Sequence, residues 1–96
     1  MVLTYQKKTY EPHAAVFKAL GHPVRLWIVS QLADEREHCV CEFVDKTTIN
    51  FSTVSQHLQV LKGAGIVGDD KRGKQVYYKL LRPCILDFVA CLKRRS

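Results

Sequence analysis

Two cysteines separated by a single residue, Cys39 and Cys41, are the side chains of this sequence whose type and spacing best suit chemistry. Thiolates are the ligands that soft metal ions prefer, and thiols are also open to oxidation. The pair stands shortly before residues 52–58, Ser-Thr-Val-Ser-Gln-His-Leu, which have the composition of a DNA-recognition helix. This arrangement indicates a sulfur-based sensor that reports to a DNA-reading element.

The size and charge of the chain support a DNA partner. Ninety-six residues predict one domain, 1–96, and 15 Lys and Arg against 9 Asp and Glu give a formal net charge of +6. Such a balance favours a polyanion, and double-stranded DNA is the expected partner. No apolar run approaches the ~20 residues of a membrane span, so we expect no membrane partner. The polar start of the chain is unlike a secretory signal, which predicts a cytoplasmic location and reduced cysteines.

The helices and strands that must position these residues are predicted from the Pro, Gly and capping residues at their ends and from the spacing of apolar residues. Pro12 opens a helix that Gly21 ends, Pro23 opens a second, and Val40, Phe43 and Val44 mark a third. After a turn at 47–51, Ser52 is the predicted N-cap of a fourth helix, which Gly63-Ala64-Gly65 ends. Residues 66–67 and 76–80 are predicted strands, 69–74 their turn, and Pro83 starts a last helix. The fold class is mainly α with a β-hairpin, a winged helix-turn-helix.

The residues expected to contact DNA lie on the fourth helix and on the hairpin. Short hydrogen-bonding side chains near a helix N-terminus suit base edges in the major groove, and a cationic hairpin tip suits the phosphate backbone. The helix residues are Ser52, Thr53, Ser55, Gln56 and Gln59, and the hairpin residues are Lys71, Arg72, Lys74 and Tyr77. A solvated polar helix face and a soluble basic turn are the alternative interpretation of each signal taken alone. His57, at the edge of the buried stripe, is interpreted as a helix-packing residue, and His13 and His22 as capping or surface residues.

Four segments of the chain together resemble the ArsR/SmtB family of winged-helix metalloregulators. They are Ala19-Leu20-Gly21-His22-Pro23-Val24-Arg25-Leu26, the recognition-helix segment 52–58, Leu61-Lys62-Gly63-Ala64-Gly65-Ile66-Val67, and Gly73-Lys74-Gln75-Val76-Tyr77-Tyr78-Lys79-Leu80. The resemblance covers about residues 12 to 92. It implies a homodimer, joined through the first and last helices, that represses a promoter until an inducer binds. The apolar last helix fits a dimer independently, because one small protomer has little with which to cover both of its sides.

The thiol pair takes part in the same resemblance. Cys39-Val40-Cys41-Glu42-Phe43 is similar to the metal-binding box at the start of the family's third helix, which implies As(III) or Sb(III) as inducer, or alternatively Cd(II) or Pb(II), without an organic cofactor. Residues two apart on a regular helix point about 200° from each other, so joint chelation requires the helix start to distort, and that distortion would disturb DNA binding. A disulfide within so short a segment would be strained, which favours metal binding over simple oxidation of the pair.

Two departures from the family pattern leave the ligand set incomplete. The third cysteine of arsenite-responsive members is replaced by Val44, and residues 1–38 lack the N-terminal cysteines of cadmium-type members. A third ligand is therefore sought in His38, in Cys84 or Cys91 from elsewhere in the dimer, or in a small thiol. Cys84 and Cys91 are also interpretable as small apolar residues of the last helix. The His/Asp zinc site of the family's last helix is expected to be absent.

Three other functions remain open for the sequence. A thiol-redox or reactive-sulfur sensor of the same fold uses the same two cysteines. A small thiol enzyme lacks support, because there is no Cys-x-x-Cys motif or catalytic triad pattern, so we expect no enzyme. A pure protein-interaction module would not need the basic hairpin.

Overall fold

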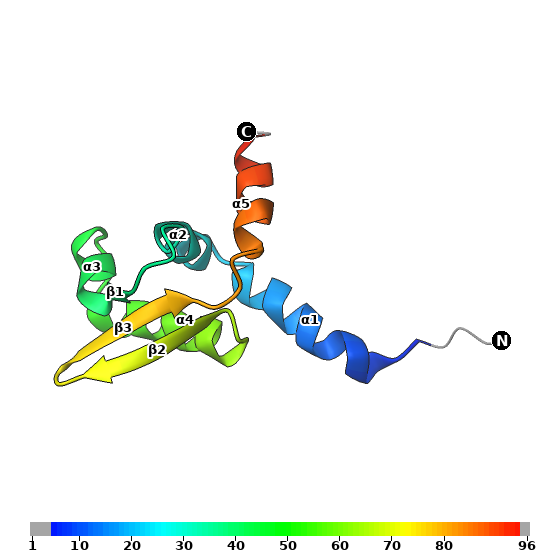
Figure 1. The fold of residues 1–96 in the computed structure, drawn as a ribbon, viewed down its shortest axis with the longest axis horizontal. Coiled ribbons are helices and arrows are strands. Elements are labelled where there is room, and N and C mark those ends of the chain that lie inside the picture. The colour runs from blue at the N-terminus through cyan, green and yellow to red at the C-terminus, as the bar shows by residue number, and fades with distance from the viewer. Residues whose placement is uncertain (1–4, 95–96) are drawn as a thin grey trace.

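Five helices and three strands make up the computed structural model, which describes residues 5–94 (Figure 1). The elements are α1 (Lys7–Leu20), α2 (Pro23–Gln31), β1 (His38–Cys39), α3 (Val40–Asp45), α4 (Phe51–Gly63), β2 (Val67–Arg72), β3 (Gln75–Leu80) and α5 (Ile85–Arg94). The predicted helix order and the winged helix-turn-helix are confirmed, with β1 added. Residues 1–4, part of the polar start considered above, lie outside the described range. None of the described helices has the length and apolar character needed to cross a membrane.

Helix α1 begins earlier than predicted, at Lys7, so that Pro12 lies inside it. A proline within a helix removes one backbone donor. Pro12 is exposed and close to the helix start, where water can take the place of the missing donor. The end of the helix at Gly21 and the start of α2 at Pro23 are as predicted, and Nδ1 of His22 accepts the backbone N–H of Val24 at 3.1 Å. The capping role expected for His22 is confirmed.

The recognition helix α4 also begins earlier than predicted. Asn50, and not Ser52, is the N-cap, because its Oδ1 accepts the backbone N–H of Thr53 at 2.9 Å. Asparagine and serine are about equally favoured at this position, so residue type alone does not choose between them. The difference moves Ser52 into the first turn of the helix, where its side chain is exposed. The predicted inner face is confirmed, with Val54, Leu58 and Leu61 fully buried; these three residues give α4 its place in the core.

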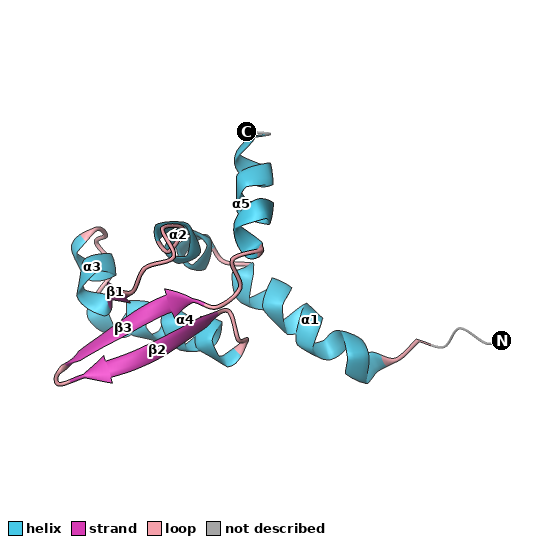
Figure 2. Ribbon diagram, viewed as in Figure 1, coloured by secondary structure: helices cyan, strands magenta, loops and turns pink. Residues whose placement is uncertain are grey.

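The sheet has the order β1-β3-β2 and is antiparallel throughout. Its hairpin strands are longer than predicted, since β2 extends to Arg72 and β3 begins at Gln75, leaving only Gly73 and Lys74 in the turn. Gly73 has φ +61°, a left-handed conformation that glycine adopts without steric cost. Figure 2 shows the hairpin projecting past the helices as a narrow wing. We call residues 67–80 the wing.

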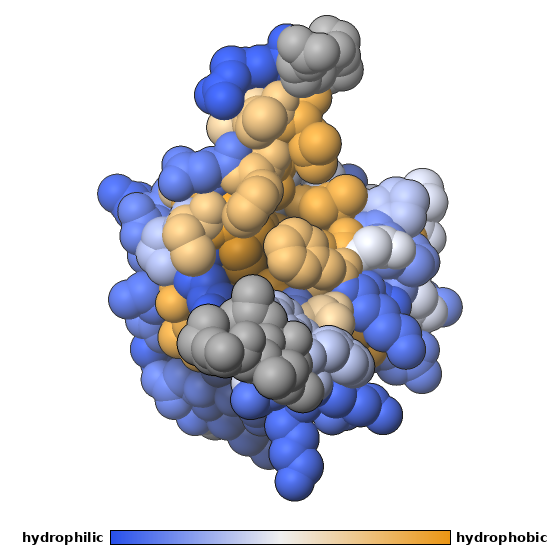
Figure 3. All heavy atoms as spheres, turned by 90° about the vertical axis from the view of Figure 1, so that its right-hand side faces the viewer, coloured by the Kyte–Doolittle hydropathy of each residue, from blue (hydrophilic) through white to orange (hydrophobic). Residues whose placement is uncertain are grey.

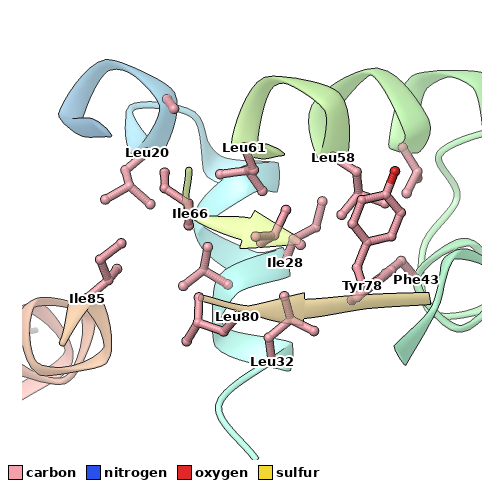
Figure 4. Close-up of a cluster of buried hydrophobic side chains, with 14 of the residues drawn as sticks. Leu20, Ile28, Leu32, Phe43, Leu58, Leu61, Ile66, Tyr78, Leu80 and Ile85 are labelled. Atoms are coloured by element: carbon pink, nitrogen blue, oxygen red, sulfur yellow. The ribbon is translucent and has the colours of Figure 1, made fainter. Parts of the chain in front are cut away.

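One apolar core joins the helices to the sheet (Figure 4). Its largest fully buried side chains are Phe43, Ile28, Leu32, Leu58, Leu61 and Ile66. Burial of a side chain of this size stabilises a fold by about 1.5–3 kcal/mol. Leu20 from the end of α1 and Ile85 from the start of α5 reach the same core, so the two outer helices are anchored by the ends that meet there.

Much of α1 and α5 projects from this core (Figure 1). The buried residues of α1 are Ala19 and Leu20, and those of α5 are Ile85 and Val89. The radius of gyration is 15.1 Å, whereas a compact chain of this length would have about 12–13 Å. The protomer is therefore more extended than a self-contained domain, and the excess length lies in its first and last helices.

Candidate functional site

The thiol pair lies where β1 meets α3. Cys39 has an extended backbone, φ −69° and ψ 146°, and is the N-cap of α3, whereas Cys41 is in the first turn. The structure joins the two sulfurs as a disulfide, with the Cα atoms 5.2 Å apart. The expectation that the two side chains diverge was wrong, because it placed both residues on a regular helix, whereas Cys39 is the extended N-cap. Once reduced, two sulfurs held side by side suit chelation of one soft ion.

The start of α3 fixes the position of the thiol pair through a capping box. Oε2 of Glu42 accepts the backbone N–H of Cys39 at 2.9 Å, and the backbone N–H of Cys41 donates to Sγ of Cys39 at 3.3 Å. A cysteine thus occupies the place that serine or threonine usually takes in this motif. Cys39 is 6% exposed and Cys41 is exposed, so the pair has one protected and one accessible sulfur.

His38, one candidate for the third ligand, is engaged by carboxylates on both sides of its ring. Nδ1 lies 3.0 Å from Oε2 of Glu42, and Nε2 lies 2.9 Å from both carboxylate oxygens of Asp34. The hydrogen bond from His38, with help from the backbone N–H of Arg36, lowers the pKa of Asp34 below its usual value. His38 would have to give up one of these contacts before a ring nitrogen could bind a metal ion.

Cys84 and Cys91, the other candidates, are free and exposed. Cys84 precedes α5 and Cys91 lies within it, and α5 stands apart from α3 and β1 in Figure 1. Within residues 5–94, no three or more His, Cys, Asp or Glu side chains are grouped so as to hold a metal ion. Within the described residues of one protomer, the structure therefore brings Cys39 and Cys41 together without a third ligand grouped with them.

Helix α4 turns a polar face to the solvent. Four of its predicted base-reading residues lie in its first two turns: Ser52, Thr53, Ser55 and Gln56. Ser52 and Gln56 are exposed, and the other two are half-buried. Gln59 is exposed too, but its Nε2 donates to Oη of Tyr78 at 3.1 Å. Gln59 therefore connects α4 to the wing as well as facing outward.

The wing carries the predicted backbone-contacting residues Lys71, Arg72, Lys74 and Tyr77. Both lysines are exposed, and neither takes part in an ion pair of the described residues. Arg72 differs, because Nη2 is bonded to Oε2 of Glu37 and Nε donates to Oδ2 of Asp70 at 2.9 Å. Its guanidinium also lies 4.9 Å from the centroid of the Tyr77 ring. The cation predicted to contact phosphate is thus held by two carboxylates and an aromatic face.

Strand β1 connects the thiol pair directly to the wing. Cys39 is opposite Tyr77 in the β1–β3 ladder, and Sγ of Cys39 lies 2.9 Å from Oε1 of Gln75. The sequence did not predict this connection, because a strand of two residues is too short to show an alternating pattern. It makes Cys39 and the wing parts of one sheet, with Cys41 two residues later in α3.

His57 anchors α4 to the join of α1 and α2. Nε of Arg25 donates to Nδ1 of His57 at 3.1 Å, while Nη1 of Arg25 donates to the carbonyl of Ala19 at 3.1 Å. The rings of His22 and His57 are 4.4 Å apart. Burial, followed by the charges of His22 and Arg25, lowers the pKa of His57 below its ordinary value. The structure gives His57 the expected packing role, as a neutral acceptor.

An apolar groove of about 320 Å³ runs between α1 and α5. Figure 3 shows apolar side chains gathered on this side of the molecule. Phe17, Phe88 and Leu92 are 61%, 58% and 62% exposed, and the rings of the two phenylalanines meet edge to face at 6.0 Å. Monomeric proteins rarely leave a large contiguous apolar patch open to water, so this groove has the character of an interface.

Comparison with known proteins agrees with this geometry. Residues 22–68 match the family described as "Bacterial regulatory protein, arsR family". The chain is 42% identical over 72 residues to an uncharacterized HTH-type transcriptional regulator of Methanocaldococcus jannaschii, covering 75% of this chain and 81% of that protein. It is 43% identical over 79 residues to the HTH-type transcriptional repressor SmtB of Mycobacterium tuberculosis, covering 78% of this chain and 58% of the repressor.

A cadmium regulator and a solved structure add to the comparison. The chain is 43% identical over 67 residues to a cadmium resistance transcriptional regulatory protein CadC homolog of Staphylococcus aureus, covering 70% of this chain and 55% of that protein. The chain thus spans little more than half of the length of the SmtB and CadC relatives. The homodimeric winged helix-turn-helix DNA-binding domain of a possible ArsR-family regulator from Mycobacterium bovis superposes with a TM-score of 0.78 at 29% identity, covering 97% of this chain and 87% of that domain.

Proposed function

The chain belongs to the arsR family of bacterial regulatory proteins, and we propose that it is a dimeric repressor. In this proposal the repressor leaves its operator when a soft metal or metalloid ion binds Cys39 and Cys41. The observation that carries the proposal is the pair of sulfurs held together at the end of β1, a strand of the wing sheet. A ligand at these sulfurs acts on a strand that is hydrogen-bonded to the wing.

Two adjacent surfaces of the protomer support operator binding. The exposed start of α4, with Ser52 and Gln56, offers donors and acceptors to base edges in the major groove. Lys71 and Lys74 at the wing tip offer to phosphates a positive charge that no ion pair among residues 5–94 neutralises. Base contacts then set sequence preference and the lysines set affinity, as in other helix-turn-helix proteins.

The groove between α1 and α5 supports the dimer. Phe17 and Phe88 remain more than half exposed in the protomer, and a second copy of the chain would cover them. The solved Mycobacterium bovis domain of the same fold is described as homodimeric. A two-fold dimer presents two copies of α4, so its operator would be an imperfect inverted repeat with half-sites about one helical turn apart.

The donor set of the thiol pair selects the class of inducer. Two sulfur ligands favour soft ions over magnesium or calcium. We propose As(III) or Sb(III), with Cd(II) or Pb(II) as the alternative; the name of the CadC relative supports Cd(II). Such an ion would supply bonds to both sulfurs and to one further ligand, for which Cys84 or Cys91 of a second protomer, a small thiol from solution and His38 are the sources to be tested.

Release of DNA follows from the position of Cys39. Its backbone pairs with Tyr77 of β3, and its sulfur lies beside Gln75 at the start of that strand. A ligand that moves this sulfur changes the contacts that hold β3, and with it the wing. A coupling of the usual size for linked sites, about 1–3 kcal/mol, would weaken operator binding 5- to 150-fold.

The decisive experiment measures release of DNA by the reduced protein. Duplexes enriched by the protein from a random library serve as fluorescent probes, and anisotropy is followed while arsenite, antimonite, Cd(II) or Pb(II) is added. We expect release by at least one of these ions and its loss in Cys39→Ser and Cys41→Ser. Cys84→Ser and Cys91→Ser then show whether α5 supplies the third ligand.

Two outcomes would contradict the proposal. Release by arsenite or cadmium that survives Cys39→Ser would place the sensor elsewhere. Release by peroxide or polysulfide, together with indifference to every ion, would make the protein a thiol-redox or reactive-sulfur repressor, with reversal by a dithiol as the check.

A further inference from the structure

Arg72 sits where β2 ends beside the turn of the wing, and it holds three groups at once. Its Nη2 is bonded to Glu37, its Nε donates to Asp70 at 2.9 Å, and its guanidinium lies over Tyr77. Asp70 and Tyr77 belong to the wing itself, whereas Glu37 does not. The Glu37 contact therefore ties the wing to a separate segment of the chain.

Glu37 lies in the segment that leads into the thiol pair. It immediately precedes β1 and stands two residues before Cys39. The β1–β3 ladder joins the same segment to the wing, but it has only two residue pairs, His38 with Tyr78 and Cys39 with Tyr77. The ion pair from Glu37 to the far strand β2 thus spans the sheet and supplements a very short ladder.

The two carboxylates also make Arg72 unsuited to contact phosphates. A DNA phosphate would have to compete with Glu37 and Asp70 for the same guanidinium, and the acidic side chains would lie close to the DNA backbone. The neighbouring Lys71 and Lys74 carry no such partners among the ion pairs of the described residues. The phosphate contacts of the wing are better assigned to these lysines.

We propose that Arg72 is a positioning residue, and that the Glu37–Arg72 ion pair couples the thiol pair to the wing. The inference rests on the proposed function, because it assumes that the wing contacts DNA and that the sulfurs bind the inducer. In the ligand-free protein the pair holds the wing in its DNA-binding position. A ligand at Cys39 displaces the segment that carries Glu37, and the wing follows.

The exposure of the Glu37–Arg72 ion pair sets how much it contributes to the coupling. The side chains of Arg72 and Glu37 are 50% and 41% exposed, and a single exposed ion pair contributes a factor of about 1.4 to 5 in an equilibrium. A factor of this size is a measurable part of the 5- to 150-fold coupling typical of linked sites. Loss of the pair is thus expected to reduce inducer-driven release by a factor of about 1.4 to 5, without abolishing it.

A double-mutant cycle tests the inference with Glu37→Gln, Arg72→Gln and the combined variant. Operator affinity is measured over a range of salt concentrations, without ligand and with CdCl₂ or sodium arsenite, and binding of the ions is followed by sulfur-to-metal absorbance. We expect both single variants to reduce the coupling alike, the double variant to reduce it no further, and ion affinity without DNA to stay the same. Arg72→Lys, which keeps the charge, should restore part of the coupling.

The control is Lys74→Gln, which should lower the salt slope by about one, while Arg72→Gln leaves the slope near that of the wild type. The inference is overturned if Arg72→Gln lowers the slope like Lys74→Gln and Glu37→Gln tightens DNA binding, because Arg72 would then be a phosphate contact. Failure of the wild type to release DNA with these ions, and with antimonite and Pb(II) as well, would refute the thiol-ligand proposal instead. In that case the salt slope and the non-additivity of the cycle still decide whether Arg72 positions the wing.

Discussion

Arg25 donates a hydrogen bond from Nε to Nδ1 of His57, 3.1 Å away, and so ties the first turn of α2 to the middle of the recognition helix. The same guanidinium reaches back to the carbonyl of Ala19 in α1. One side chain thereby connects a helix of the apolar groove to the helix proposed to read DNA. The contact requires a neutral His57, because a protonated imidazole has no lone pair to accept with.

Protonation of His57 should therefore destabilise the fold. Its pKa is lowered from the ordinary value of 6.5, mainly by burial, so below that pH the unfolded chain binds the proton more readily than the folded chain. The stability that neutral His57 contributes is fully present above about pH 6.5, and it is lost as the pH falls toward the lowered pKa of His57. Urea unfolding at pH 7.5 and 5.5 should show a smaller loss in His57→Gln than in the wild type. His13→Gln, an exposed histidine of α1, is the control, and equal losses in all three proteins would contradict the assignment.

Replacement of Gln56 by alanine should relax sequence preference. Gln56 is exposed near the start of α4, where its amide can pair with a base edge. We expect a loss of about 1–3 kcal/mol of discrimination at one position of each half-site. Affinities for duplexes substituted one base pair at a time would measure it. A uniform loss over all duplexes would mean that Gln56 contacts the DNA backbone.

Replacement of Lys74 by alanine should lower the affinity for DNA and leave sequence preference unchanged. Lys74 is exposed in the turn of the wing, so its loss should weaken every duplex to a similar extent and reduce the slope of log affinity against log salt by about one. The matched control is Lys79→Ala, at the other end of β3. An unchanged slope for Lys74→Ala would remove the wing tip from the DNA interface.

Replacement of Phe88 by aspartate should weaken the dimer. The side chain lines the apolar groove beside Phe17, and a charge there would have to be buried without a partner when two protomers meet. Light scattering during gel filtration should show a shift toward monomer and a parallel loss of operator affinity. Phe51→Asp is the control for the light-scattering measurement alone, because Phe51 is similarly exposed, at 59%, but lies at the start of α4 and not in the groove. A Phe88→Asp dimer of undiminished stability would place the interface elsewhere.

The helices were predictable because their signals are local. Val54, Leu58 and Leu61 repeat with the period of a helix, and Pro23 marks the first residue of α2. The first residue of α4 was harder to predict, because Asn50 and Ser52 are both suitable N-caps. The choice between them depends on how the preceding turn packs. The full length of β2 was not predictable from its sequence, since Gly-Asp-Asp-Lys-Arg has low strand propensity and is held by pairing with β3.

The thiol site was predictable in its residues but not in its geometry. The pair Cys39 and Cys41 is evident from spacing alone, whereas its relation to Gln75 depends on a two-residue strand that forms by pairing across the sheet. The ion pairs of Arg72 were not predictable for the same reason. Its charge suggested phosphate, but Glu37, far away in the sequence, lies within reach only once the sheet is formed.

Because Cys39 is the N-cap of α3, its sulfur atom caps the helix and, in the proposed function, also binds the ion. Oxygen suits the first role better, and sulfur suits the second. An oxygen is the stronger cap, and serine is among the residues that helices select for this position. Cys39→Ser therefore keeps the geometry of the cap while removing the soft donor, whereas Cys39→Ala removes both. The thermal midpoint should be unchanged or higher for the serine variant and lower for the alanine variant. In the proposed function, sulfur at this position thus exchanges helix stability for the capacity to bind a soft ion.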